Sequence, residues 1–225
     1  MRPTQNILRL AAATAILVGA ASAQSAIKVP LGPAPTIDGT IADAEWAGSS
    51  TFDLVNGGGL LLRHDGTHLY VGIKGTGKGW CHVYVAQGLR VDVLHASAAL
   101  GSLAFTQDAV GKWQSADKYS WEMRDRTLND DTKAKLARYL AANGWVASNS
   151  NMGEPLEMEF KIARGSGPLS IAVVHTVDGK TMNFFPSKLA DDTLRSDLVR
   201  GEVPSGLSFT RDRWARLNIL EKKNK

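Results

Sequence analysis

Alternating apolar and polar residues mark several short segments of this chain as β-strands. The clearest runs from Leu156 to Ile162, where apolar residues at even positions alternate with Glu157, Glu159 and Lys161. Successive side chains of a strand point to opposite faces of its sheet. We therefore expect Phe160 and the other even positions to face a core, and the three charged side chains to face water or a rim.

The same alternation predicts further strands, bounded by Gly, Asp and Asn turns. They are Leu60–Leu62, His68–Ile73 after Asp65-Gly66, Leu169–Val173, Thr181–Phe185 after the hairpin signal Asp178-Gly179, and Trp214–Leu220 with Ala215, Leu217 and Ile219 inward. Such spacing is typical of an antiparallel sheet.

One helix is expected between Asp130 and Gly144, because Asp130 or Asp131 can cap its start and Gly144 stands where a helix terminator belongs. Its apolar stripe consists of Leu136, Tyr139 and Leu140. A weaker helical pattern covers Ser187–Arg200. Many short strands with few helices predict an all-β protein, an antiparallel β-sandwich with one short helical insertion.

The N-terminus predicts export. Arg2 and Arg9 flank a short positive region, Leu10–Ala20 carries no charge, and Ala21-Ser22-Ala23 supplies the small residues of a cleavage site. The apolar run is about a dozen residues, short of the roughly 20 that span a bilayer. We expect residues 1–23 to be a signal peptide, residues 24–225 to form a single domain without a membrane span, and the protein to be periplasmic or secreted.

Charge and cysteine content exclude some functions. Removing residues 1–23 takes away two arginines and no acid, so the net charge falls from +4 to +2, too little to favour nucleic acid as a partner. Cys81 is the single cysteine, so no internal disulfide can form and an apolar core must hold the domain. Cys81 and His82 are adjacent, and alternation would turn them to opposite faces, so a buried cysteine is favoured over a metal ligand.

The segment Thr36–Trp46, with Ile37-Asp38-Gly39, a short spacer, an acid and Trp46, resembles the opening motif of family-9 carbohydrate-binding modules and related DOMON-like domains. Leu60–Ile73 looks like the strand pair that follows in that family, and Glu157–Ile162 and Trp214–Leu220 fit its closing strands. The resemblance implies a β-sandwich, often exported, of a kind that binds sugars or haem. Trp46 itself is expected in the core, because Asp38-Gly39 can turn the chain between two buried apolar residues.

The middle of the chain, from about Gly75 to Asn151, is where a specialised site is expected. Sugar binding needs flat aromatic faces together with polar groups that reach the hydroxyls. We predict that Trp80, Trp121 and Trp145 stack on a ligand and that His95 and Arg124 make polar contacts with it. Each tryptophan taken singly is also compatible with a core position.

His95 lies on the predicted face of Val91 and Val93 and is followed by Ser97. A nucleophile pair would need these two side chains to meet, with an orienting acid and an oxyanion hole, and no Gly-X-Ser-X-Gly elbow surrounds Ser97. A satisfied interior histidine is therefore the simpler interpretation of His95, and we expect no enzyme activity.

Haem and metals are the remaining alternatives. A haem b held between a methionine and a histidine could use Met123, Met152, Met158 or Met182 with His64, His68, His82, His95 or His175. Met158 is a poor ligand because it faces the predicted core, and the chain has no Cys-X-X-Cys-His for covalent attachment. Asp38, Asp43, Asp130 and Asp131 show no EF-hand spacing, so no metal site and no cofactor is assigned.

These patterns predict an exported, non-catalytic module that binds a glycan or another small ligand. Two other functions stay open: a haem-binding or redox domain, and an interaction module with a protein partner in the cell envelope.

Overall fold

The structure is a computed structural model, and it describes residues 26–97, 100–116, 120–123, 130–149, 157–189 and 207–220. The predicted signal peptide, Arg124, Met152, Leu156 and most of the weak helical pattern therefore lie outside the described residues. None of the helices in the described ranges is long and apolar enough to cross a bilayer.

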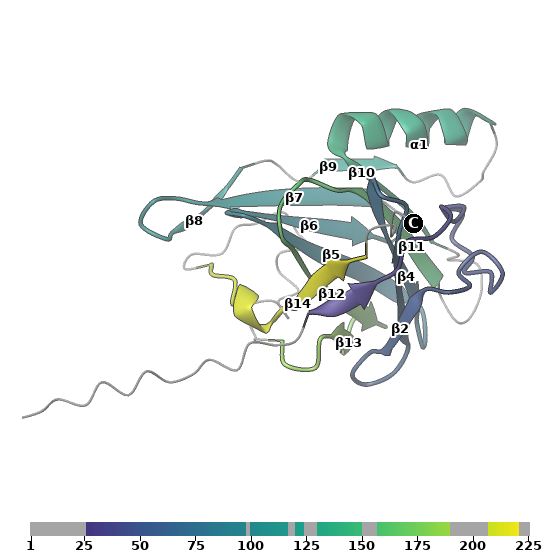
Figure 1. Cartoon of the computed structure of the whole chain (residues 1–225), viewed down its shortest axis with the longest axis horizontal. Coiled ribbons are helices and arrows are strands. Elements are labelled where there is room, and N and C mark those ends of the chain that lie inside the picture. The colour runs from purple at the N-terminus through teal and green to yellow at the C-terminus, as the bar shows by residue number, and fades with distance from the viewer. Residues whose placement is uncertain are drawn as a thin grey trace, which may run out of the picture.

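The elements follow one another as short strands with one α-helix between them (Figure 1). They are β1 (Ile27–Val29), β2 (Ser50–Asp53), β3 (Gly59–His64), β4 (His68–Lys74), β5 (Gly79–Gln87), β6 (Arg90–Ala96), β7 (Leu100–Gln107), β8 (Trp113–Ser115), β9 (Ser120–Met123), α1 (Asp130–Asn143), β10 (Trp145–Asn149), β11 (Glu157–Ala163), β12 (Leu169–Val177), β13 (Thr181–Phe185), the 3-10 helix η2 (Arg211–Arg213) and β14 (Ala215–Ile219). The all-β class with a single short α-helix is confirmed for the described residues.

The strands form two sheets. The larger has nine strands in the order β1-β14-β12-β5-β6-β7-β8, with β13 also paired to β12 and β9 to β7. The smaller has five, in the order β10-β11-β4-β3-β2. Among the pairs of named strands, β1–β14 is parallel and the others are antiparallel. The sandwich prediction is confirmed.

The main core lies between the sheets and follows the predicted alternation. Leu60, Leu62, Leu69, Val71, Ile73, Met158, Phe160, Ile171 and Val173 are all fully buried there. Ala215 joins them, and Leu217 and Ile219 pack against them partly buried. The predicted inward faces of these strands are therefore confirmed.

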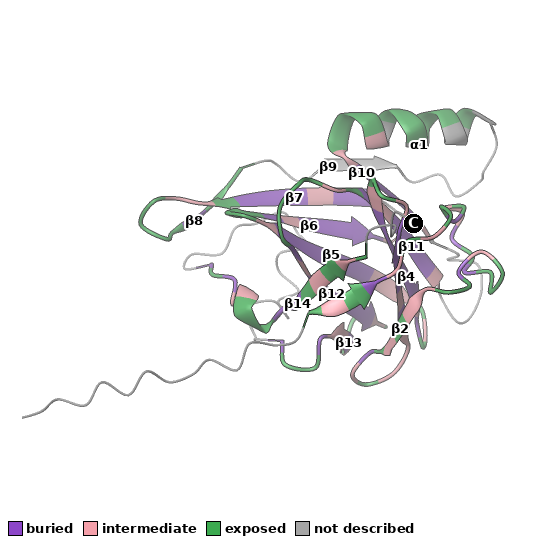
Figure 2. Ribbon diagram, in the orientation of Figure 1, coloured by how far each residue is buried: buried purple, intermediate pink, exposed green. Residues whose placement is uncertain are grey.

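A second apolar cluster covers the outer face of the larger sheet. Tyr84, Phe105, Trp113, Phe209 and Trp214 are buried in it, and their rings meet edge to face. The central strands β5, β6 and β7 are consequently buried on both faces, and Figure 2 shows them almost entirely in the colour of buried residues.

The N-terminal motif covers the outer face of the smaller sheet. Trp46 is buried, as predicted, and packs with Ile41 and Tyr70 in a third cluster. A Cβ atom placed on Gly72 would lie 3.1 Å from the indole of Trp46, so a larger residue here would push the ring slightly away from β4.

Glu159 corrects the sequence prediction for this strand. We expected it to face water or a rim, but its side chain is fully buried beneath the N-terminal motif. Its carboxylate accepts hydrogen bonds from the backbone N–H groups of Asp38 (3.1 Å) and Gly39 (2.8 Å) and from Nε1 of Trp46 (2.9 Å). Burial raises the pKa of Glu159 to about 7, against these hydrogen bonds, which favour the ionised form. Glu159 is therefore on the predicted face of β11, and the N-terminal motif that covers this face explains its burial.

Two predicted turns have the expected backbone. Asp178 and Gly179 both have positive φ, at 49° and 69°, as the two central residues of a type I′ turn require, and the Lys180 N–H closes this turn on the carbonyl of Val177 at 3.0 Å. Gly144 ends α1 with φ of 71° and donates its N–H to the carbonyl of Leu140. The helix between Asp130 and Gly144 is thus confirmed, whereas the side chains of Leu136 and Tyr139 lie outside the described residues. Within the described ranges the weak helical pattern begins as a turn rather than a helix.

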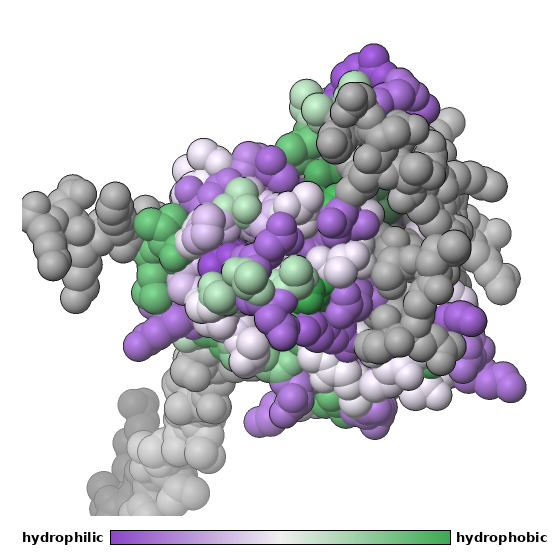
Figure 3. Space-filling view, turned by 90° about the vertical axis from the view of Figure 1, so that its right-hand side faces the viewer, coloured by the Kyte–Doolittle hydropathy of each residue, from purple (hydrophilic) through white to green (hydrophobic). Residues whose placement is uncertain are grey.

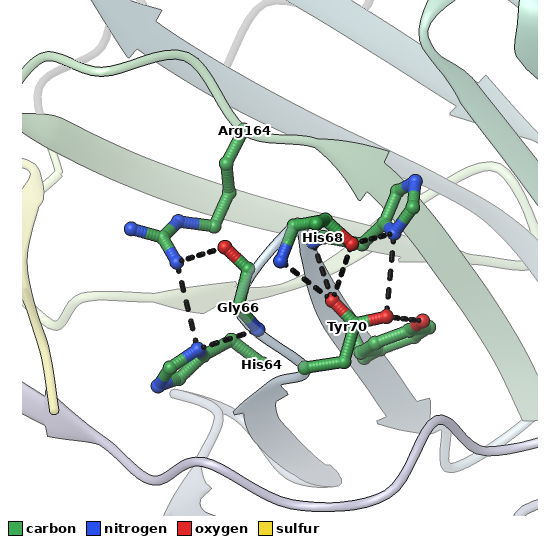
Figure 4. Close-up of polar contacts among 7 residues, drawn as sticks. His64, Gly66, His68, Tyr70 and Arg164 are labelled. Carbon is green, nitrogen blue, oxygen red and sulfur yellow. Dashed lines mark hydrogen bonds and ion pairs between the residues drawn. The ribbon is translucent and has the colours of Figure 1, made fainter. Parts of the chain in front are cut away.

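The Asp65 side chain holds the turn between β3 and β4 (Figure 4). Its Oδ1 accepts hydrogen bonds from the backbone N–H groups of Thr67 and His68, and its Oδ2 accepts one of 2.6 Å from the hydroxyl of Tyr70. Partial burial would raise the pKa of Asp65, but these hydrogen bonds outweigh it and hold the pKa well below the usual range. The acid is therefore ionised and sets the register of this hairpin.

His64 ties the same turn to the end of the chain. Its Nδ1 accepts a hydrogen bond from the backbone N–H of Gly66 at 3.1 Å, so Nε2 carries the proton and donates it to the carbonyl of Leu220 at 3.0 Å. Arg164 approaches both Nδ1 of His64 and the carbonyl of Gly66 (Figure 4). His64 is therefore committed to a structural role.

Candidate functional site

A cavity of about 720 Å³ opens between the larger sheet and the end of α1. Its floor is the inner face of β5, β6 and β7, and its wall is the start of β10 with the end of β11. The described residues that line it are Val85, Gln87, Arg90, Asp92, Leu94, Ser102, Ala104, Ala142, Asn143, Gly144, Trp145, Ile162 and Ala163.

The floor exists because the larger sheet extends beyond the smaller one. On β6, Asp92 and Leu94 face inward together, and on β7 Ser102 and Ala104 do the same, as the period of two requires. Farther along the strands this inner face packs against Phe160 and its neighbours. Beside the edge strand β10 the same inner face borders the cavity.

Arg90 and Asp92 provide the only charges in the described lining. The Arg90 guanidinium reaches the Asp92 carboxylate with Nη2 to Oδ1 at 2.8 Å and Nε to Oδ1 at 2.9 Å. Both side chains are partly exposed, at 47% and 30%, so the pair adds little to stability. Because the two charges cancel, the described lining has no net side-chain charge.

The rest of the lining combines apolar walls with neutral polar groups. Val85, Leu94, Ala104 and Ile162 offer aliphatic surface, and Trp145 is 3% exposed, so it closes the wall rather than presenting an open ring. Gln87, Ser102 and Asn143 bring amide and hydroxyl groups, which can both donate and accept hydrogen bonds.

Of the five ligand-binding residues predicted from the sequence, the three with described side chains, Trp80, His95 and Trp145, do not form one surface. Trp145 lines the cavity on the inner side of the larger sheet. Alternation along β5 and β6 places Trp80 and His95 on the outer side of that sheet. The backbone of Trp121 pairs with Gly101, its side chain is not among those described, and Arg124 lies outside the described residues.

Trp80 lies against a hairpin. A Cβ on Gly179 would be 3.5 Å from Cη2 of Trp80, and Nε1 of Trp80 is buried without a hydrogen-bond partner among the described residues.

The sequence did not single out the polar residues of the cavity lining, which are Gln87, Arg90, Asp92, Ser102 and Asn143. The spacing of Arg90 and Asp92, two apart on a strand, was the one signal that could have indicated a shared polar face.

His95 belongs to a chain of polar groups on the outer face. Its Nδ1 is 3.0 Å from Nε2 of His82, which lies directly across on β5, and its Nε2 is 3.0 Å from Oγ of Ser97. Both imidazoles are 2% exposed. Burial lowers the pKa of His95 to about 4, and burial together with His95 holds the pKa of His82 well below the usual value. The interior position of His95 is thus confirmed, and Ser97 meets it.

Another buried histidine lies between the sheets. His175 is fully buried, directly across from Cys81 on one side and Asn183 on the other. Neither of its ring nitrogens has a hydrogen-bond partner among the described residues, and burial lowers its pKa to about 4. Cys81 is buried as predicted, and burial raises the pKa of its thiol.

These histidines predict acid sensitivity. Their folded pKa lies below the unfolded value, so the unfolded chain takes up protons first, and stability is lost as the pH falls from about 6.5 towards 4. We expect His175 alone to account for about 2 kcal/mol of the loss between pH 7 and pH 5. Denaturant unfolding at both pH values should show a smaller loss in His175→Gln than in the wild type. Equal losses would contradict the assignment.

Metal and haem chemistry gain no support from these positions. In the described ranges no group of three or more His, Cys, Asp and Glu side chains could hold a metal ion. The described lining of the cavity includes no histidine or methionine, so none of it could bind a haem iron. Met158 lies in the main core, as predicted.

Comparison with known proteins yields one distant likeness. No family model and no curated protein matches the chain, so the resemblance to family-9 carbohydrate-binding modules and DOMON-like domains stays a prediction. A crystal structure of a "putative carbohydrate-binding protein" from Bacteroides uniformis superposes with a TM-score of 0.45 at 12% identity, over 87% of this chain and 100% of that one. At this distance the likeness does not indicate a shared ligand.

Proposed function

We propose that this protein is a binding module whose cavity holds a neutral, polyhydroxylated small molecule such as a mono- or disaccharide. The observation that carries the proposal is the cavity of about 720 Å³, whose described lining combines apolar side chains with amide and hydroxyl groups and has no net charge. Its size falls within the range of about 300–1,000 Å³ that small-molecule sites occupy.

The lining suits sugar chemistry better than charged or purely apolar ligands. Aliphatic walls can cover the C–H faces of a ring, while Gln87, Ser102 and Asn143 can meet hydroxyls that both donate and accept. The Arg90–Asp92 pair neutralises itself, so it offers hydrogen bonds without selecting an ion. The described lining has no histidine, cysteine or second carboxylate that could work with Asp92 on a substrate. This supports binding rather than turnover in the cavity.

Compartment and partner complete the proposal. A cleaved N-terminal signal would place the module in the periplasm or outside the cell, where it meets glycans or an envelope protein. Figure 3 shows hydrophilic and apolar side chains interspersed on the face that it presents. This gives a protein-docking function no particular support on that face.

Calorimetry with a panel of neutral mono- and disaccharides tests the proposal. We expect at least one ligand to bind, and Ala104→Leu, which fills the cavity floor, to weaken it more than 10-fold. Gln87→Leu should cost one hydrogen bond, about 1–1.5 kcal/mol, which is roughly a 5–10-fold loss.

Trp80→Ala is the matched control because Trp80 lies on the other side of the larger sheet. If the cavity is the site, this change leaves the affinity unaltered. Loss of binding in Trp80→Ala but not in Ala104→Leu would move the site to the outer face. A Soret band in the purified protein would favour the haem alternative instead.

A further inference from the structure

The polar chain on the outer face of the larger sheet is separate from the cavity, and its chemistry is different. We propose that Ser97 is a nucleophile that accepts acyl groups from activated esters, with His95 as its general base and His82 as the residue that positions His95. The proposal concerns a second site and does not depend on the ligand of the cavity.

The fold brings these three side chains together by strand geometry. Ser97 is two residues after His95 and directly follows the last residue of β6, and its hydroxyl lies on the same face as the His95 ring. Register places His82 of β5 directly opposite His95, where cross-strand side chains are closest. The result is two contacts of 3.0 Å each, Ser97 Oγ to His95 Nε2 and His95 Nδ1 to His82 Nε2.

Two opposite arrangements of protons fit these two distances, and the proposed nucleophile uses the one in which Ser97 donates. If Ser97 donates to Nε2 of His95, then His95 carries its own proton on Nδ1 and donates it to Nε2 of His82. His82 in turn carries its proton on Nδ1. Each ring is neutral, and the serine hydroxyl points its proton at a basic nitrogen, which is the arrangement that general-base activation of a serine needs.

His82 occupies the place that a carboxylate holds in the Ser-His-Asp arrangement. In this arrangement His82 accepts the Nδ1 proton of His95, so it holds the ring in one orientation and in the tautomer whose Nε2 accepts the proton of Ser97. A neutral imidazole stabilises the charged His95 less than an acid would, and the described residues assign no oxyanion hole beside Ser97, so we expect a slow nucleophile. His82 does not touch the ester, and its role is positioning.

Burial and exposure are distributed as this chemistry requires. His82 and His95 are each 2% exposed, whereas Ser97, the outermost of the three polar residues, is partly exposed. On the other side of His95 the paired residue of β7 is Gly101, which has no side chain to crowd the ring. Burial lowers the pKa of His95 to about 4, so its ring is unprotonated at neutral pH. The same shift makes it a weak base.

The reaction balances without a cofactor. Oγ of Ser97 attacks the ester carbonyl while its proton moves to Nε2 of His95. The ester C–O bond then breaks, and the leaving alcohol takes that proton. The products are the alcohol and acyl-Ser97, and attack of water, again deprotonated by His95, releases the acid and restores the serine.

Labelling by a fluorophosphonate probe, with the modified residue located by mass spectrometry, tests the nucleophile directly. We expect the wild-type protein to be labelled at Ser97 and to release p-nitrophenol from p-nitrophenyl acetate. Ser97→Ala should lose both signals. Ser170→Ala is the matched control. Ser170 is a partly exposed serine of β12 on the same outer face of the larger sheet, and its cross-strand partners, Ala86 and Arg216, are not histidines.

The histidines are tested by the rate of labelling. His95→Gln should lower the rate about 100-fold, the lower end of what a general base contributes. His82→Phe should lower the labelling rate about 10-fold. His82→Gln can still accept a hydrogen bond from Nδ1 of His95, so it should recover most of the rate. Denaturant unfolding confirms that each variant is folded.

Two results would overturn the proposal. One is a wild-type protein in which Ser97 is labelled no faster than Ser170. The other is equal labelling of Ser97 in the wild type and in a folded His95→Gln variant. If His95→Gln does not fold, the comparison of His82→Phe with His82→Gln decides, and equal rates in that pair reject the positioning role.

Discussion

Replacing Phe160 by alanine is expected to lower the free energy of unfolding by about 3–5 kcal/mol. Phe160 is fully buried in the middle of β11 and packs between the two sheets, with its ring 6.5 Å from that of Trp145. The loss combines the lost transfer free energy of the ring with the cost of the cavity that remains, because sheets on both sides limit collapse.

Urea or guanidinium unfolding of the variant and the wild type at pH 7 measures this loss, provided that the free energy of unfolding falls with denaturant at the same slope in both proteins. Val110→Ala is the control, because Val110 is 87% exposed and its truncation should change stability by less than about 0.5 kcal/mol. A loss below about 1 kcal/mol for Phe160→Ala would mean that this residue does not hold the two sheets together.

Replacing Glu159 by leucine is expected to cost about 3–5 kcal/mol, although leucine is apolar and the site is buried. The change leaves the N–H groups of Asp38, Gly39 and Trp46 without their acceptor, and two of these three hydrogen bonds are buried. Unmet buried donors cost more than the burial of leucine returns.

Glu159→Gln separates hydrogen bonding from shape, because it keeps one acceptor oxygen and should lose roughly half as much. Lys161→Ala, on the same side of β11, is the matched control with an expected change within about 0.5 kcal/mol. A Glu159→Leu variant as stable as the wild type would show that the N-terminal motif is not anchored through this carboxylate.

Strands whose sequence alternates clearly were predictable, and the central strand β5 was not. In β4, β11 and β12 apolar residues recur at every second position, which is enough to predict a strand. Turn residues such as Asp178-Gly179 favour the positive φ angles that the turn needs. β5 reads as Trp-Cys-His-Val-Tyr-Val-Ala, which alternates poorly because both faces are covered. Even in β11 the covering motif turned Glu159 from an expected rim residue into a buried anchor.

The candidate site was only partly within reach of the sequence. Trp145 lines the cavity, but Trp80 and His95, which were grouped with it, lie across the sheet. Residue types can indicate that tryptophans and polar groups suit a sugar, yet the period of two assigns faces only within a strand. Which faces meet depends on the order of strands in a sheet and on how far one sheet extends past the other.

Periodicity and turn chemistry by themselves determined the all-β class, most inward faces, the helix end at Gly144 and the interior position of His95, because each is a local property of backbone geometry. Only the tertiary structure decided that a cavity opens between the larger sheet and the end of α1, that Trp46 and Glu159 meet, and that His82 completes the contact from His95 to Ser97. Such contacts join segments distant in the chain. They follow from register and layer packing, which no single stretch of residues encodes.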